Sequence, residues 1–158
     1  MIKIHFCHSK GIVGAAIRAI TFSEFNHVAI ELDGVIYHST FLKGVHALPA
    51  EGFVDGYDHV ETFEIQGTDE QKAREWLTSQ LGAGYDLSAL VALPFREDWQ
   101  KPGRWFCSEF AAALLIVLEY IGDLFEESRI APERLRVILV ALRGKCGTHE
   151  IGSVAEPR

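Results

Sequence analysis

The segment 27–40, HVAIELDGVIYHST, places the strongest constraint on how this chain can fold. Two runs rich in β-branched and aromatic residues flank Asp33-Gly34, and Asp-Gly between such runs is the strongest short signal for a β-hairpin with a two-residue turn. The turn fixes the register, because Leu32 must then face Val35 and every further pair follows by counting outward. The sequence therefore predicts an antiparallel hairpin with a known register.

The register also assigns each residue to one face of the hairpin, because side chains alternate along a strand. The face expected to pack on the core carries Val28, Ile30, Leu32, Val35 and Tyr37. His27, Ala29, Glu31 and His38 share the other face. The two histidines are diagonal neighbours there, roughly 7–8 Å apart at the backbone, and the small Ala29 leaves room for their rings. A plain amphipathic strand needs no such pair, so it is a candidate functional site.

A cysteine opens the most apolar helix that the sequence predicts. Cys107 stands in RWFCSEF, directly before AAALLIVLEYI, so it is expected in the first helical turn. The positive end of the helix dipole favours a thiolate there, and the unpaired backbone N–H of Cys107 is a suitable oxyanion donor. A cysteine nucleophile also needs a base and a polar group that orients the base. His27 fits the first role, and His38, or else Glu31, fits the second.

Each of these residues also has an ordinary structural interpretation. A lone cysteine such as Cys107 is more often a small buried hydrophobe, and a lone histidine or glutamate in a strand is more often solvated. Their combination favours catalysis. A zinc site at His5, Cys7 and His8 is a further interpretation, but no second ligand pair with structural-site spacing follows them. No metal or other cofactor is expected.

Other patterns complete the expected architecture. They predict an N-terminal strand, a second strand over HVETFEIQ, and a helix capped by Thr68 at its start and Gly82 at its end. Further helices are expected over 11–22, 86–95, 108–121 and 131–142. The sequence therefore predicts an α+β fold in a single domain over 1–143, followed by a polar C-terminal tail over 144–158.

Composition excludes several classes of protein. The 158 residues are 48% hydrophobic and 23% charged, which suits one stable globular domain. A net charge of -7 without a dense Lys/Arg cluster argues against a nucleic-acid partner or an anionic membrane. The longest apolar stretch, 110–118, is far shorter than the roughly 20 residues of a transmembrane helix.

The cysteines and the N-terminus bear on the compartment. Three cysteines without paired spacing argue against a disulfide framework, and the N-terminus lacks the pattern of a signal peptide. We expect a cytoplasmic protein, or one released without a signal peptide as a phage-associated protein would be. The sequence leaves the oligomeric state open.

Several motifs together resemble a known family. FNHVAIELDG with YHST downstream, QLGAGYDLSALVALPF, RWFCSEFAAALL and IAPERL are similar to the circularly permuted papain-like cysteine hydrolases of the NlpC type. These are the YiiX-like amidases, to which lecithin–retinol acyltransferase is related. The resemblance covers about residues 10–135. It implies a permuted papain-like fold, in which the histidine strand precedes the cysteine helix and an antiparallel sheet packs against that helix.

The resemblance also implies roles for individual residues. It assigns Cys107 as the nucleophile, His27 as the base and His38 as the third member of the triad. The gap between the histidines is one residue shorter than in the acyltransferase branch, which keeps Glu31 as an alternative orienting residue. Tyr85 is similar to an aromatic residue that lies near the substrate cleft of the family, although a core tyrosine is equally compatible.

Two residues after the cysteine are assigned to the same cleft. They are Ser108 and Glu109, and Glu109 has a charge–dipole role at the helix start as its alternative.

The function implied is hydrolysis of an amide bond through a thiolate and an acyl-enzyme. The substrate would be a peptidoglycan-type peptide or another acyl-amide. Two alternatives stay open: a lipid acyltransferase or thioesterase, and a non-catalytic peptide-binding module on the same fold. The acyltransferase branch has Asn-Cys-Glu at the nucleophile, and Phe106-Cys107-Ser108 departs from it. Cys107 is expected to react as a thiolate near neutral pH, unlike Cys7 and Cys146.

Overall fold

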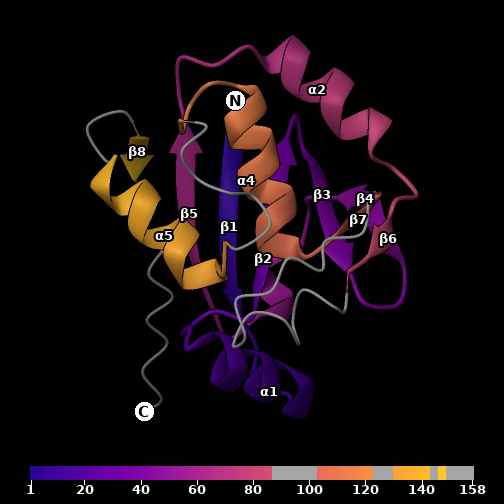
Figure 1. Ribbon diagram of the computed structural model, residues 1–158, viewed down its shortest axis with the longest axis vertical. Helices are drawn as coiled ribbons and strands as arrows, with labels where there is room; N and C mark the ends of the chain where they lie inside the picture. Colours follow the sequence, from indigo (N-terminus) through magenta and orange to yellow (C-terminus); the bar gives the residue numbers. More distant parts are fainter. Residues whose placement is uncertain (87–102, 123–129, 143–145, 149–158) are drawn as a thin grey trace.

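The computed structural model describes residues 1–86, 103–122, 130–142 and 146–148 and has an α+β fold (Figure 1). Six antiparallel strands form one sheet in the order β4-β3-β2-β1-β5-β8. Its strands are β1 (Ile2–His8), β2 (His27–Leu32), β3 (Val35–Thr40), β4 (Gly44–Pro49), β5 (His59–Ile65) and β8 (Cys146–Thr148). A separate parallel pair consists of β6 (Gly84–Tyr85) and β7 (Arg104–Trp105).

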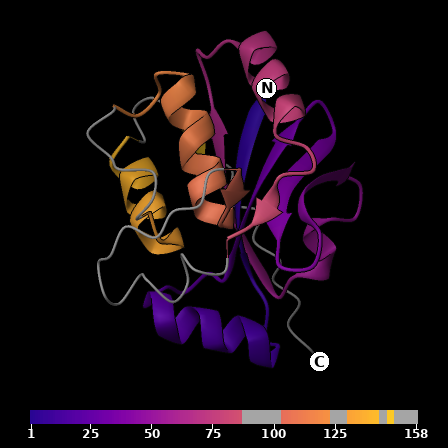
Figure 2. The ribbon, with the colours of Figure 1, turned by 45° about the vertical axis from the view of Figure 1, so that its right-hand side comes forward.

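Three helices cover one face of the sheet (Figures 1 and 2). They are α2 (Glu70–Ser79), α4 (Cys107–Val117) and α5 (Pro132–Ala141), while α1 (Ile12–Thr21) lies beyond one end of the strands. A short 3-10 helix, η1 (Val54–Gly56), precedes β5. The expected class, α+β with an antiparallel sheet packed against the helix that begins at Cys107, is confirmed. None of the described helices is long and apolar enough to cross a membrane.

Helix α4 lies at the centre of the core because it is apolar on all sides. Its residues from Cys107 to Leu115 are all buried, as expected of a helix without a polar face. Phe110 and Leu114 belong to the same core cluster as Val28 and Ile30 of β2. The apolar face expected for the hairpin is therefore the face that the helices cover.

The hairpin turn forms as the sequence predicts. Asp33 and Gly34 have φ angles of 51° and 75°, the left-handed pair of a type I′ turn. The expected pairs from Leu32–Val35 to Ile30–Tyr37 are present, but the β2–β3 ladder then ends. Ala29 and His27 are therefore not paired with β3, contrary to the counted register. The two strands separate where the histidines lie.

Strand β4 was not predicted, and it continues the sheet beyond β3. Its register pairs His38 with His46 and Thr40 with Gly44. Gly44 has a φ of 64°, and a Cβ there would lie 2.1 Å from the backbone oxygen of Ala83. The same oxygen accepts a hydrogen bond from the Val45 N–H at 2.8 Å. Only glycine permits this close approach of two backbone segments.

We expect Gly44→Ala to lower the free energy of unfolding by about 3 kcal/mol, from the strained φ and the backbone collision together. Gly34→Ala is the matched control, because Gly34 also has a positive φ, 75°, but a Cβ there meets nothing within 4 Å. It should cost only about 1 kcal/mol. Urea unfolding of both variants measures the difference, and equal losses would contradict the collision.

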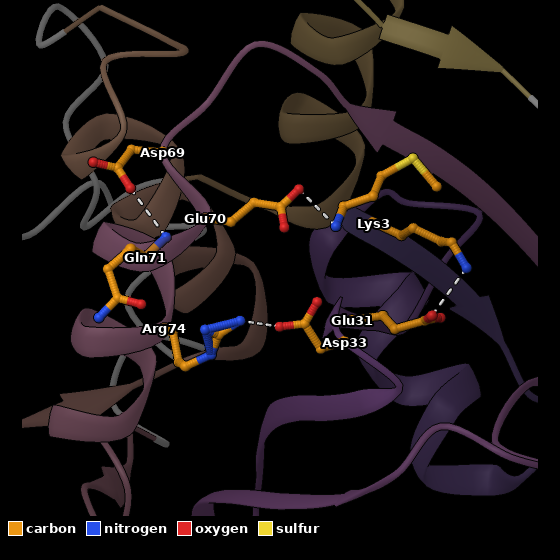
Figure 3. Close-up of polar contacts among 8 residues, drawn as sticks. Lys3, Glu31, Asp33, Asp69, Glu70, Gln71 and Arg74 are labelled. Atoms are coloured by element: carbon orange, nitrogen blue, oxygen red, sulfur yellow. Dashed lines mark hydrogen bonds and ion pairs between the residues drawn. The ribbon is translucent and has the colours of Figure 1, made fainter.

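Three other expectations are corrected. The N-cap of α2 is Asp69, not Thr68, because the Asp69 carboxylate accepts a hydrogen bond from the Gln71 N–H at 3.0 Å (Figure 3) and another from the Lys72 N–H at 3.0 Å. Helix α4 ends at Val117 instead of continuing to residue 121. Cys146–Thr148, in the segment expected to be a tail, pairs with β5. The helix expected over 86–95 falls almost wholly outside the described residues.

Candidate functional site

Three histidines on neighbouring strands form a continuous hydrogen-bonded chain. His27 of β2 contacts His38 of β3 through Nε2 and Nδ1, 2.9 Å apart. His38 contacts His46 of β4 through their two Nε2 atoms, also 2.9 Å apart. His46 Nδ1 lies 3.0 Å from the carbonyl oxygen of Gly44. His27 and His38, expected to be diagonal neighbours, are thus in direct contact, and His46 adds a third ring to the chain.

Two aromatic rings cover this histidine chain. Tyr57 stacks on His27 with ring centroids 6.2 Å apart, and Phe53 meets the His38 ring edge-on at 5.6 Å. Phe53 and Tyr57 also contact each other. Burial lowers the pKa of His27 to about 3 and that of His38 to about 4, and the neighbouring imidazoles act in the same direction. Both rings are therefore neutral near physiological pH.

Cys107 occupies the first position of α4, and its side chain is buried. The backbone N–H groups of Val28 and Ser108 point at the sulfur and lower its pKa, but burial outweighs them and raises the pKa to about 12. The thiol is thus protonated in this structure. The expected thiolate near neutral pH is not supported, because the helix terminus stabilises the thiolate less than desolvation destabilises it. Burial raises the pKa of Cys7 as well.

Cys107 and the histidines belong to opposite faces of the sheet. Helix α4 covers the face of Val28, whereas His27 and His38 lie on the other face. Val28, whose N–H reaches the Cys107 sulfur, directly follows His27, and both residues lie in the part of β2 that is no longer paired with β3. No hydrogen bond joins the Cys107 thiol to the His27 ring in the described part of the chain. Catalytic contacts are often longer before substrate binds.

Glu31 is engaged away from His27. Its carboxylate accepts hydrogen bonds from Lys3 at 2.9 Å (Figure 3) and contacts His5 Nε2 at 3.0 Å. The other ring nitrogen of His5 contacts Thr62. These bonds lower the pKa of Glu31 even though burial opposes them. The side chain that contacts His27 is therefore that of His38, not that of Glu31.

The three residues assigned to the substrate cleft fall into two groups. Tyr85 lies beside the cysteine segment: its ring meets Phe106 edge-on at 5.9 Å, and burial, followed by the nearby Cys107, raises its pKa. Ser108 is fully buried and donates a hydrogen bond to the carbonyl of Ile130. Glu109 is 2% exposed and accepts a hydrogen bond from the Phe106 N–H at 3.1 Å. Ser108 and Glu109 are thus buried and hold the start of α4, and their assignment to a substrate cleft stays a prediction.

Sequence reasoning missed His46 and Tyr57. His46 could have been found by extending the hairpin count, because a short turn after Thr40 places residues 38 and 46 opposite each other. Tyr57 stands in an irregular segment next to η1, where no periodicity indicates a contact with His27.

The zinc site considered for the N-terminal strand does not form. His5 is bonded to Thr62 and Glu31, and His8 Nδ1 contacts the carbonyl of Glu24 at 2.8 Å. Across residues 1–86, 103–122, 130–142 and 146–148, no group of three or more His, Cys, Asp or Glu side chains could hold a metal ion.

Comparison with known proteins yields a likeness in structure alone. No protein-family model matches this sequence, and a comparison with curated proteins finds no match either. The crystal structure of the metalloprotein yiiX from Escherichia coli O157:H7 is similar, with a TM-score of 0.56 and 19% identity. The match covers 75% of this chain and 66% of that one, just under two thirds. The α+β fold described above is thus similar to that of yiiX.

Proposed function

We propose that this protein is a cysteine hydrolase that cleaves an amide bond, with Cys107 as nucleophile, His27 as base and His38 as the residue that orients the base. The observation that carries the proposal is the contact of His27 Nε2 with His38 Nδ1 at 2.9 Å. It fixes the ring of His27 through one nitrogen and leaves Nδ1 for a thiol proton. A base held in this way is what thiol nucleophiles require.

The mechanism starts from a neutral pair, because burial holds Cys107 protonated and His27 unprotonated. The sulfur attacks the substrate carbonyl carbon while its proton passes to His27 Nδ1, and the C=O electron pair becomes an oxyanion. The backbone N–H of Cys107, in the first helical turn, is available to the oxyanion. When the C–N bond breaks, His27 returns the proton to the leaving amine.

The second half of the cycle reuses the same residues. The acyl group is then a thioester on Cys107, and His27 is again neutral. Water attacks the thioester carbonyl and gives its proton to His27, which passes it to the departing Cys107 sulfur. An acid product and the free thiol result, so the balance requires water alone. The resemblance to the permuted papain-like hydrolases supports the same assignment.

Hydrolysis or transfer of a lipid acyl group is the second candidate, and one observation favours it. The turn between β3 and β4 exposes Phe41 by 60% and Leu42 by 88%. The Phe41 ring also meets Tyr85 edge-on, with centroids 5.9 Å apart. Exposed apolar side chains next to the cysteine segment suit a substrate with an apolar group. Acyl-amides share that feature with lipid esters, so a substrate screen must decide.

The proposal predicts a covalent adduct at Cys107. Purified protein is incubated with muropeptides, N-acyl amino acids and phospholipids, and products and intact protein are followed by mass spectrometry. We expect release of an amine from one of the amides and an acyl adduct that maps to Cys107. Prior treatment with iodoacetamide should abolish both, whereas EDTA should not.

Other outcomes would contradict the proposal. Hydrolysis that resists iodoacetamide but stops with EDTA would indicate metal chemistry, a relevant comparison because the similar structure is named a metalloprotein. An adduct from phospholipids alone would favour the lipid candidate. Binding of a peptide without any turnover would indicate a non-catalytic module.

A further inference from the structure

The three-histidine chain ends on a backbone carbonyl, and this end determines where every proton in the chain lies. His46 Nδ1 is 3.0 Å from the Gly44 carbonyl oxygen. A carbonyl oxygen can accept a hydrogen bond but can never donate one. His46 must therefore carry its proton on Nδ1, so a neutral His46 has a lone pair on Nε2.

The remaining tautomers follow ring by ring. Because His46 Nε2 is an acceptor, His38 must donate from its own Nε2 across the 2.9 Å contact. A neutral His38 then has its lone pair on Nδ1, so His27 donates from Nε2 across the next 2.9 Å contact. His27 is left with its lone pair on Nδ1, the nitrogen that a thiol proton would have to reach.

We propose that His46 is a positioning residue. Its hydrogen bond to the Gly44 carbonyl fixes its own tautomer and, through the ring contacts, the tautomer of His38, so that His27 presents an unprotonated Nδ1 to Cys107. The catalytic consequence rests on the proposed function, whereas the tautomers are a property of the free protein.

Burial and backbone geometry keep this arrangement in place. A protonated imidazole donates from both nitrogens, so protonation of His38 on Nδ1 would set a second N–H against the N–H that His27 donates. The cover formed by Phe53 and Tyr57 disfavours the charged forms. The Gly44 carbonyl is itself held in position, because Gly44 adopts a φ of 64° and packs tightly against the backbone of Ala83.

The direct test is nitrogen NMR of isotope-labelled protein near neutral pH, which distinguishes the two neutral tautomers of each histidine. The intact protein should show the Nδ1–H form for His46 and the Nε2–H form for His27 and His38. His46→Leu removes the acceptor for His38 at similar volume, whereas His46→Gln retains one in its side-chain oxygen. His8→Gln, a histidine substitution elsewhere in the sheet, is the control for general perturbation.

We expect His46→Leu to give mixed tautomers at His27 and His38 and to lower kcat by about 10- to 100-fold with little change in KM. His46→Gln should retain the tautomers and most of kcat. A purely structural His46 would instead lower stability in both variants and leave the tautomers and kcat of the folded fraction unchanged. That result would overturn the inference.

The design separates this inference from the proposed function. The expected tautomers, mixed by His46→Leu, in a protein without hydrolase activity would support the relay and refute the hydrolase. Hydrolysis through Cys107 in a protein whose His27 carries its proton on Nδ1 would overturn the relay and leave the hydrolase intact. If His46→Leu does not fold, the tautomers of the intact protein and of His46→Gln still decide.

Discussion

Replacing Cys107 with alanine is expected to lower kcat/KM for the amide substrate by about a thousandfold or more, while the protein stays folded. The reason is that the substitution removes the proposed nucleophile, and loss of a nucleophile has effects of this order or larger. The cavity left by one buried sulfur costs about 1 kcal/mol of unfolding free energy. Steady-state kinetics and urea unfolding on the same preparation measure the two effects.

Cys7→Ala is the matched control, since Cys7 is also a buried free cysteine, on the neighbouring strand β1. It loses the same sulfur atom at a position without a helix terminus, so kcat/KM should change little. If Cys107→Ala retained most of the activity, the reaction could not proceed through this thiol. If both variants lost activity equally without unfolding, Cys107 would have no special role.

The hairpin was predictable because its signal is local. The Asp33-Gly34 turn fixes both the φ angles and the first three pairs, and the structure confirms them. The end of the β2–β3 ladder was not predictable, because pairing away from the turn depends on how the rest of the fold packs, which the sequence of the hairpin does not contain. Local patterns determine how strands begin to pair, and long-range packing determines where pairing ends.

Strand β4 shows a second limit. Its sequence, GVHALP, starts with glycine and ends with proline, residues that are rare in strands. Its pairing with β3 and the close contact of Gly44 with Ala83 overcome these preferences. Because β4 was not predicted, the predicted site contained His27 and His38 but not His46, and the chain of three rings was incomplete.

The protonation of Cys107 shows why a position alone does not determine a pKa. A helix terminus contributes about 0.3–1 kcal/mol to a charged group near the surface. Full burial acts on the same thiol in the opposite direction and raises its pKa to about 12 despite three backbone N–H groups. The sequence indicates that Cys107 begins an apolar helix, but it does not indicate that the Cys107 side chain itself is 2% exposed.

Acidification is expected to unfold this protein through its neutral histidines. The pKa values of His27 and His38 in the folded protein, about 3 and about 4, lie below the ordinary value of 6.5. Between these limits the unfolded chain binds more protons, so the stabilisation is complete above about pH 6.5 and is lost as the pH falls. Each histidine contributes a slope approaching about 1.4 kcal/mol per pH unit.

Urea unfolding between about pH 6.5 and about pH 4.5 measures this effect, because ordinary carboxylates, with pKa values of about 3.9 and about 4.3, stay mostly ionised over this range. Wild-type protein should lose up to about 5 kcal/mol across the window, the sum for two histidines. His5, whose pKa burial also lowers, adds to the loss in every variant that retains it. The double variant His27→Gln/His38→Gln should show a much smaller slope, since glutamine does not titrate. Equal slopes in the wild type and the double variant would mean that these rings accept protons in the folded state, and the neutral chain that orients His27 would then not exist in this form.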